Sequence, residues 1–500
     1  MLAERQSEAV RIAEAGLMRS RGQLAQARSG YFPQLTATAA YQRTLQSQFQ
    51  KIFESVEQEP EEPSDPGGGG DGLEDSPITQ IFASENTVTL GLQFTQNLWT
   101  GGRIAAMDRA ARAGRRAAEI EVVAQRAQLQ LDVTEAYYDA LLADRLLAIA
   151  DSSLIQTERT LRQAQLGYQV GTQSEFDMLR ASVTRDNQRP QLVQARAMRE
   201  TAYLRLAQML ELPLDEPLNL TTPIEEGVPQ ARQLAEAAAE QRGVPTQPVS
   251  LDVDVAQVLA RDPVVVALVD SIAMLSDTSA ASRSLVRQAG ENLVAQQSQL
   301  KAARAQRWPA LQLQSLYQRF AYPSNSIPGW NSYFPNWTVS VGLSVPILSG
   351  GRIRGEILAA EAEVVEARET HRQAEEAARL DARLAIAALE QAAESYSASR
   401  GTEQQALRAY SIAEIRFAEG ISSQMELNDS RLLLQQAQAN QAQAARDLAV
   451  ARMRLLLLAD LPLGGSAAGM SAPGAPGGAG AATGAPAGQV STGQSGIPPM

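Results

Sequence analysis

The residue types that most often carry out chemistry are scarce in this chain. Its 500 residues include no cysteine and one histidine, His371. Without cysteine there is no thiolate nucleophile, no disulfide and no cysteine-based zinc or iron–sulfur site. His371 lies in a charged run, 367–378, that predicts a solvated helix face. The sequence also holds no phosphate-binding loop, metal-ligand cluster or nucleophile–base pair, so we expect no enzyme, no cofactor and no metal.

An acidic segment within 54–75 is a second candidate for chemistry. Four consecutive glycines, Gly67 to Gly70, and several prolines interrupt it. Clustered carboxylates can bind cations, yet this composition is typical of a solvated, mobile insertion, which is the interpretation we favour. Its carboxylates include Glu57, Glu59, Glu61, Glu62 and Asp65.

Composition excludes several classes of protein. A net charge of −12 and a pI of about 4.9 do not support nucleic-acid binding. The sequence contains no run of 18 apolar residues, so no transmembrane helix is predicted. The first ten residues carry charges where a signal peptide needs an apolar segment. Aromatic residues are only 5% of the chain while hydrophobic residues are 44%, so alanine-rich, closely spaced helices are expected.

The chain contains two copies of one unit. TGGRI at 100–104 returns as SGGRI at 349–353, an offset of 350 − 101 = 249. The same offset relates YQVG at 168–171 to FAEG at 417–420, and LPL at 212–214 to LPL at 461–463. Upstream, FPQL at 32–35 and YQR at 41–43 match WPAL at 308–311 and YQR at 317–319, an offset of 308 − 32 = 276. The difference, 276 − 249 = 27, predicts an insertion in the first copy, within 54–80.

These motifs predict four regions. The first repeat covers 1–223, with strands at about 34–43 and 87–99, a long helix at 102–166 and a return helix at 173–211. The segment 224–280 is a linker. The second repeat covers 281–463, with strands at about 310–320 and 337–348, a long helix at 351–416 and a return helix at 423–460. The tail, 464–500, contains no charged residue and is rich in Gly, Ala and Pro, so we expect disorder.

The expected strands alternate between apolar and polar residues, as half-buried strands do. Two interpretations stay open: a small sheet packed on a helix, or a membrane barrel with a small, neutral polar face toward a water-filled lumen. Aromatic residues near the strand ends match the interfacial girdles of a barrel, but the strands alone do not decide between the two interpretations. Four strands cannot close a transmembrane barrel, which needs at least about eight. A barrel would therefore require several copies of the chain.

The long helical segments predict a coiled coil or a helical tube. Residues 103–166 contain no proline and one glycine, and would extend about 95 Å at 1.5 Å per residue. Gly171 and Gly420 are placed to end these helices in the left-handed conformation. Thr172 with Glu175 and Ser423 with Glu426 are spaced as capping boxes of the return helices. Two more features concern the return helices: a predicted kink at Pro190, and a coiled-coil seam of Leu434, Ala437, Gln441, Ala444, Leu448, Ala451 and Leu455.

Together, these motifs resemble the TolC-like outer membrane factors, the exit ducts of tripartite efflux pumps and type I secretion systems. The resemblance rests on the order, duplication and spacing of the Phe/Trp-Pro-x-Leu, Gly-Gly-Arg, Tyr/Phe-x-x-Gly and Leu-Pro-Leu motifs, from about residue 8 to 463. It implies a mostly α-helical homotrimer. Four strands per protomer would form a twelve-stranded barrel in the outer membrane, in contact with its lipid, and the helices would continue it as a coiled-coil barrel across the periplasm. The strand–helix junctions would be Pro33, Gly101, Gly102, Pro309, Gly350 and Gly351.

The resemblance also implies partners and an entrance. A periplasmic adaptor protein, which connects to an inner-membrane pump, would contact the hairpin tips, formed by Gly171, Thr172, Gly420, Ile421 and Ser422. Acidic residues after the second hairpin would ring a gated entrance; the matching positions are Glu426 and Asp429. In the first copy, Asp177 is equivalent to Glu426, while Arg180 stands at the position of Asp429. The cargo is not implied.

Two features depart from the family. Its members are exported, yet no signal peptide is visible here, and the sequence enters partway into the family's first helix. A start codon placed too far downstream would explain both. The lipidated members carry an N-terminal cysteine, which this sequence lacks. The alternative function is a soluble coiled-coil scaffold, in which the strands would be incidental.

Overall fold

The computed structural model describes residues 4, 7–45, 86–214, 218–221, 278–323 and 333–462. The acidic insertion expected within 54–80 and the tail expected at 464–500 lie outside the described residues. So does the linker expected at 224–280, apart from its last three residues.

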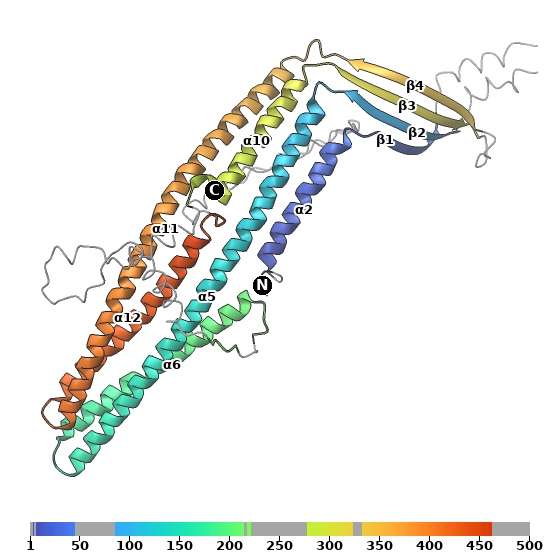
Figure 1. Cartoon of the computed structure of the whole chain (residues 1–500). Helices are drawn as coiled ribbons and strands as arrows, with labels where there is room; N and C mark the ends of the chain where they lie inside the picture. Colours follow the sequence, from blue (N-terminus) through green and yellow to red (C-terminus); the bar gives the residue numbers. More distant parts are fainter. Residues whose placement is uncertain are drawn as a thin grey trace, which may run out of the picture. The chain divides into compact units, whose positions relative to one another are not determined.

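Four antiparallel strands form one sheet in the order β1-β2-β3-β4 (Figure 1). They are β1 (Gln34–Arg43), β2 (Asn86–Trp99), β3 (Ala310–Ala321) and β4 (Phe334–Ser344). β4 begins and ends earlier than the 337–348 expected from alternation. Ser344 pairs with Ala310, the first residue of β3. The residue before Ala310 is Pro309, which has no N–H to donate, so the ladder stops there although the alternation continues.

Two helices of 67 residues each dominate the described chain: α5 (Arg103–Gln169) and α11 (Arg352–Ala418). Shorter helices precede the two hairpins, namely α2 (Glu8–Ser29) before β1 and α10 (Ser284–Ala305) before β3, the latter after the 3-10 turn η2 (Ala280–Ser282). α2 contacts α5, while α10 contacts both α5 and α11. The lateral order near the sheet is therefore α2-α5-α10-α11 (Figure 1).

The long helices fold back as α6 (Glu175–Met209) and α12 (Gln424–Leu456). α6 packs on α5, and α12 packs on both α11 and α5. The predicted seam of α12 faces its neighbours, since six of its seven residues are buried and Ala451 is half-buried. α6 continues as one helix past Pro190, and the kink there stays a prediction.

The two halves have the same internal layout. Adding 276 to the bounds of α2 gives 284–305, which are those of α10, and adding 249 to the bounds of α5 gives 352–418, which are those of α11. The return helices start at 175 and 424, again 249 apart. Equivalent residues thus occupy equivalent places in both halves.

Small side chains set the spacing of the helices. Ala140, Ala378, Ala442 and Ala445 are completely buried. An alanine at a helix contact lets two backbones approach closely, so a tube of such helices needs few bulky residues. This agrees with the low aromatic content of the chain.

A buried arginine joins the start of the second half to its end. Arg283, just before α10, is 0% exposed and donates to the Leu458 carbonyl oxygen and to Asp381 of α11. Arg454 of α12 binds the same carboxylate, with 3.2 Å between Nη2 and Oδ1. One carboxylate thereby holds three elements together.

Candidate functional site

Pairing across the sheet separates the side chains into two faces. Leu35, Phe94 and Ser315 stand opposite one another on β1, β2 and β3, so all residues of their parity share one face. That face is mainly aliphatic and aromatic on all four strands. The other face has no charged side chain on the described strands and consists largely of Thr, Gln, Ser, Asn and Gly. Its members are Gln34, Thr36, Thr38, Ala40, Gln42, Thr87, Thr89, Gly91, Gln93, Thr95, Asn97, Ala310, Gln312, Gln314, Leu316, Gln318, Phe320, Phe334, Asn336, Thr338, Ser340, Gly342 and Ser344.

Polar atoms on the apolar face are bonded to one another. The Trp337 indole N–H donates to the Ser315 hydroxyl at 2.9 Å, and Arg319 donates from Nε to the Tyr317 hydroxyl at 3.0 Å. Aromatic residues near the far end of a strand hairpin, with an arginine reaching past them, are typical of a membrane–water boundary. The apolar face therefore has the composition of a surface in contact with lipid.

The strand–helix junctions depend on glycine. Gly101, Gly102, Gly350 and Gly351 all have positive φ, between 57° and 87°. Gly102 and Gly351 are the N-caps of α5 and α11. A Cβ atom on Gly101 would lie 2.7 Å from Cβ of Trp308, so this glycine also permits close packing. Pro33 and Pro309, the other predicted junction residues, directly precede β1 and β3.

Each helical hairpin turns at a left-handed glycine, Gly171 (φ 75°) or Gly420 (φ 74°). The first capping box predicted from the sequence is wrong. The N-cap of α6 is Ser174, which forms the box with Asp177, whereas Thr172 donates to the Gly167 carbonyl oxygen. The offset of 249 already indicates this, because it maps Ser423, the N-cap of α12, onto Ser174. The predicted tip residues Thr172 and Ile421 are exposed and Ser422 is half-buried.

The three predicted entrance carboxylates have different surroundings. Glu426 is exposed in the first turn of α12 and lies 3.6 Å from Arg416 of α11. Asp429 is exposed one turn later. Asp177 accepts hydrogen bonds from the backbone N–H and the hydroxyl of Ser174, so it serves the cap of α6. Glu426 and Asp429 thus share one end of α12, and Asp177 has a structural role at the other hairpin.

A buried polar cluster, which the sequence analysis did not predict, lies between the two hairpins. Arg431 of α12 is 5% exposed and donates to the hydroxyl of Ser153 on α5, which also contacts Gln188 of α6. Burial lowers the pKa of Arg431. Burial, followed by the charge of Glu414, raises the pKa of nearby Tyr410 to about 12. Arginine is usually solvated on a helix, so the residue type alone does not indicate burial. The signal is the position of Arg431, which shares one helix face with Leu427 and Leu434.

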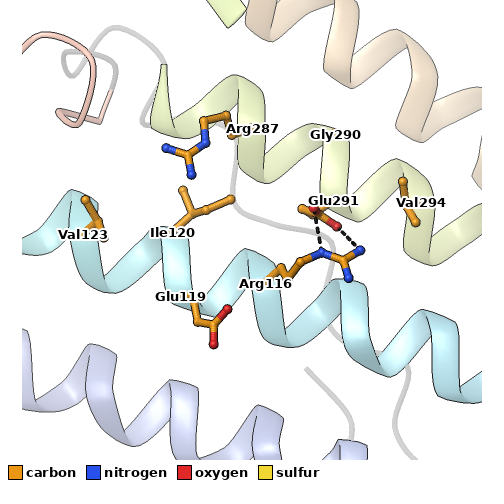
Figure 2. A pocket seen from close by; sticks show the side chains of 8 residues that line it. All are labelled: Arg116, Glu119, Ile120, Val123, Arg287, Gly290, Glu291 and Val294. Atoms are coloured by element: carbon orange, nitrogen blue, oxygen red, sulfur yellow. Dashed lines mark hydrogen bonds and ion pairs between the residues drawn. The ribbon is translucent and has the colours of Figure 1, made fainter. Parts of the chain in front are cut away.

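A groove of about 420 Å³ lies between α5 and α10 (Figure 2). A two-pronged ion pair crosses it, from Arg116 Nε and Nη2 to the Glu291 carboxylate at 2.8 and 2.7 Å. Ile120, Val123 and Val294 supply its apolar wall. On the other flank of α10, the His371 ring lies 3.4 Å from where a Cβ of Gly290 would be. The side chain of His371 is 28% exposed and lies beside Glu375, so it is half-buried at the edge of the predicted solvated face.

The described residues contain no group of three or more His, Cys, Asp or Glu side chains that could hold a metal ion. Among them, no helix combines the length and apolar character needed to cross a bilayer.

The model of one protein family, described as outer membrane efflux protein, matches residues 2–211 and 275–459 of the chain. This is well over half of the sequence and includes both repeats. The chain belongs to the outer membrane efflux protein family.

Solved structures of outer-membrane channels share the fold of this efflux protein. The OprN channel superposes with a TM-score of 0.64 at 20% identity, covering 92% of this chain and 89% of OprN. CmeC of Campylobacter jejuni gives 0.66 at 16%, covering 92% and 84%. The open state of MtrE of Neisseria gonorrhoeae gives 0.65 at 18%, covering 92% and 88%. No curated protein sequence matches the chain.

Family membership decides between the alternatives left open by the sequence. The strands of this efflux protein belong to a barrel and the helices to its extension, so the scaffold interpretation is wrong. The protein is an outer-membrane duct that serves efflux partners across the periplasm, and it is not an enzyme. The expected outer-membrane location follows.

Proposed function

We propose that three copies of this efflux protein close one twelve-stranded barrel, whose lumen is lined by the polar face of the sheet. The observation that carries the proposal is the state of the outer strands. Every residue of β1 and of β4 is exposed, and among the described residues neither strand pairs on its outer side. The sheet has two open edges, and the outward-pointing backbone N–H and C=O groups along each edge lack a hydrogen-bond partner among the described residues. In a membrane such unpaired groups are costly, so each edge needs another strand beside it.

The lumen of this barrel is neutral. On the described strands its wall carries hydroxyl and amide groups and no charged groups. The lumen is therefore hydrated and does not select passing molecules by the sign of their charge. The apolar face contacts the lipid of the outer membrane. Any preference for charge is then exercised at other levels of the duct.

The second hairpin supplies that preference. Glu426 and Asp429 lie about one turn apart on α12, and three copies place six carboxylates around the periplasmic entrance. Such a ring raises the local concentration of cations and disfavours anions. The positive charge of Arg416, which lies 3.6 Å from Glu426, weakens the negative potential of this ring. Asp177 contributes less to the entrance, because its carboxylate is hydrogen-bonded to Ser174 in the cap of α6.

The hairpin tips bind the periplasmic adaptor. Large apolar side chains are exposed at the helix ends that meet in the hairpin turns. Val170 is 73% exposed, Phe176 69% and Ile421 68%. An exposed apolar group at the end of a water-soluble hairpin marks a surface for protein contact. Through the adaptor the duct receives cargo from an inner-membrane pump, and gating occurs at this end.

Reconstitution tests the proposal. The purified protein, added to a planar lipid bilayer, should form cation-selective channels and run as a heat-modifiable trimer in electrophoresis. The same chain should restore export in cells that lack their own outer-membrane duct but keep the pump and adaptor. A water-soluble monomer that leaves the bilayer silent would contradict the proposal.

A further inference from the structure

The motif Tyr-Gln-Arg occurs twice on the strands, at 41–43 and 317–319. Its arginines, Arg43 and Arg319, share the apolar face of the sheet and therefore line neither the lumen nor the entrance of the duct. They are the only charged residues on the four described strands, which carry no carboxylate. A face that otherwise has the composition of a lipid-contacting surface thus holds two positive charges.

Both arginines lie toward the end of the sheet that is remote from the helices. β1 follows α2 and β3 follows α10, and both strands run away from these helices (Figure 1). Arg43 is the last residue of β1, and Arg319 is followed on β3 only by Phe320 and Ala321. The helices of this outer-membrane duct extend across the periplasm, so the remote end of the sheet is the outer one. The two charges therefore lie near the headgroups of the outer leaflet.

A hollow of about 280 Å³ lies on the same face, further from the outer end than Arg319. Its lining residues come from all four strands and are Leu35, Leu92, Phe94, Ser315, Tyr317 and Trp337. Ser315 is the one small side chain among them, which leaves the space above it. The Trp337 indole N–H donates to the Ser315 hydroxyl at 2.9 Å, so these two polar groups are bonded to each other. The remaining wall is apolar and suits a hydrocarbon chain.

Tyr317 connects the hollow with the arginine. Its ring lines the hollow, while its hydroxyl accepts a hydrogen bond from Arg319 Nε at 3.0 Å. Ser315 and Arg319 stand four residues apart on one strand (319 − 315), which is roughly 13 Å. An apolar hollow with a guanidinium at its outer end is complementary to an amphipathic molecule that has an anionic headgroup. Phosphate fits this position, because the guanidinium pairs with its oxygens in both charge and geometry.

We propose that this face of β3 binds a membrane lipid of the outer leaflet, with the lipid phosphate on Arg319 and one acyl chain in the hollow. The proposal rests on the proposed barrel, which turns this face toward lipid, and goes beyond it by naming the class of lipid. A lipid with a net negative headgroup binds better than a zwitterionic one, because the cationic part of the latter offsets the attraction of its phosphate to the arginine. Arg43, beside Tyr41, repeats the headgroup contact on β1.

A general property of arginine gives the contrasting expectation. A long cationic side chain near a membrane surface can extend to the water without binding any particular lipid. In that case the charge would be solvated, the hollow would fill with whichever chain is nearby, and lipids that differ only in their headgroup would occupy it equally. The preference between headgroups at the hollow therefore separates a lipid site from a solvated arginine.

Trp337 lines the hollow, so its fluorescence can report the occupant. The full chain is reconstituted in vesicles of dioleoylphosphatidylcholine, and phosphatidylglycerol or phosphatidylcholine with brominated acyl chains is titrated in. Bromine quenches a tryptophan that it touches, and the share of the quenching that disappears in Trp337→Phe belongs to the hollow. Brominated phosphatidylglycerol should occupy the hollow roughly fivefold more readily than brominated phosphatidylcholine, as one arginine at a membrane surface predicts.

Two pairs of variants separate the headgroup from the chain. Arg319→Gln should remove the preference at Trp337 and Arg319→Lys should keep most of it, whereas Arg43→Gln, which removes the equivalent charge on β1, should leave it unchanged. Ser315→Leu fills the hollow and should reduce quenching by both lipids. Ser315→Ala also loses the bond to Trp337 but leaves the space, so its quenching should stay as in the wild type.

The outcomes that overturn this site differ from those that overturn the duct. Equal occupancy by the two lipids in the wild type, or a preference that persists in Arg319→Gln, would show a solvated arginine and no lipid site. Equal quenching in Ser315→Leu and Ser315→Ala would remove the acyl chain from the hollow. Planar bilayers of the same lipids test the duct separately: a wild type that conducts without a headgroup preference loses the lipid site alone, and one that neither assembles nor conducts loses the proposed function as well.

Discussion

Arg431 of α12 donates a hydrogen bond to the hydroxyl of Ser153 on α5, and both residues are at most 5% exposed. The bond joins the second hairpin to the first. Among the residues that the structure describes, the hydrogen-bonded partner of the guanidinium is a neutral hydroxyl and not a carboxylate, and burial lowers the pKa of Arg431. A buried cation with a neutral partner is sensitive to the loss of that partner.

Removing the serine hydroxyl alone should therefore destabilise the hairpins more than removing the hydroxyl and the arginine together. Ser153→Ala leaves a buried guanidinium without its acceptor and should cost about 1–3 kcal/mol. In the double variant Ser153→Ala/Arg431→Met the buried charge is gone, and stability should recover. Thermal unfolding followed by circular dichroism in detergent gives the comparison. A double variant no more stable than Ser153→Ala alone would contradict this account of the cluster.

Charge changes at the second hairpin should alter ion selectivity in opposite directions. Glu426→Gln with Asp429→Asn removes two carboxylates per copy and should lower the ratio of cation to anion permeability, by roughly fivefold for about each 1 kcal/mol of electrostatic attraction that is lost. Arg416→Gln removes the cation 3.6 Å from Glu426 and should raise the ratio. Reversal potentials across a salt gradient measure both. Asp177→Asn is the matched control, and selectivity equal in all variants would remove these residues from the entrance.

The cap of α6 should depend on Ser174 and not on Thr172. Ser174→Ala breaks the box with Asp177 and should cost about 1 kcal/mol. Thr172→Val keeps the side-chain shape and loses only the exposed bond to Gly167, so its effect should be smaller. Protease sensitivity of the first hairpin distinguishes the variants. Greater sensitivity in Thr172→Val than in Ser174→Ala would reinstate the box that the sequence predicted.

Alanine should be tolerated differently at the two glycines that precede α5. In Gly102→Ala the added Cβ has no atom within 4 Å, so the loss of stability comes only from the left-handed backbone and should be about 1–2 kcal/mol. Gly101→Ala adds a clash with Trp308 and should reduce the yield of folded protein further. Heat-modifiable trimer in outer membranes is the readout. The Gly101→Ala/Trp308→Ala variant should regain part of the loss, and equal yields of the two single variants would show that the close approach to Trp308 is unimportant.

Asp108 should make the contact between α2 and α5 sensitive to acid. Burial raises the pKa of Asp108, but hydrogen bonds from Arg112 and Arg28, at 2.5 and 3.2 Å, outweigh it and hold the pKa below its usual value. A carboxyl whose pKa is lowered by folding stabilises the protein above its unfolded pKa, about 3.9. That stability is lost as the pH falls through the folded pKa. The thermal midpoint of Asp108→Asn should thus be lower than wild type at pH 7 and approach it below pH about 4; a constant difference would contradict this.

The sequence alone determined the repeat, the number of strands and the hairpin glycines. Each follows from local rules: strands from period-two alternation, helix ends from a left-handed glycine, and equivalence from constant offsets. Errors occurred where a boundary depends on a neighbour. β4 ends at Ser344, where β3 offers no partner beyond Ala310. Pro346 is a local signal for this end, and the alternation alone passed over it.

Tertiary structure decided which polar residues are buried and what they contact. Arg431 and Arg283 were not singled out from the sequence, and His371 was placed on a solvated face. The surroundings of these three residues depend on residues between 80 and 280 positions away in the chain, namely Ser153, Asp381 and Gly290. Periodicity specifies which face of a helix is apolar, but only the packed arrangement specifies which helix covers it, because many partners are compatible with the same stripe.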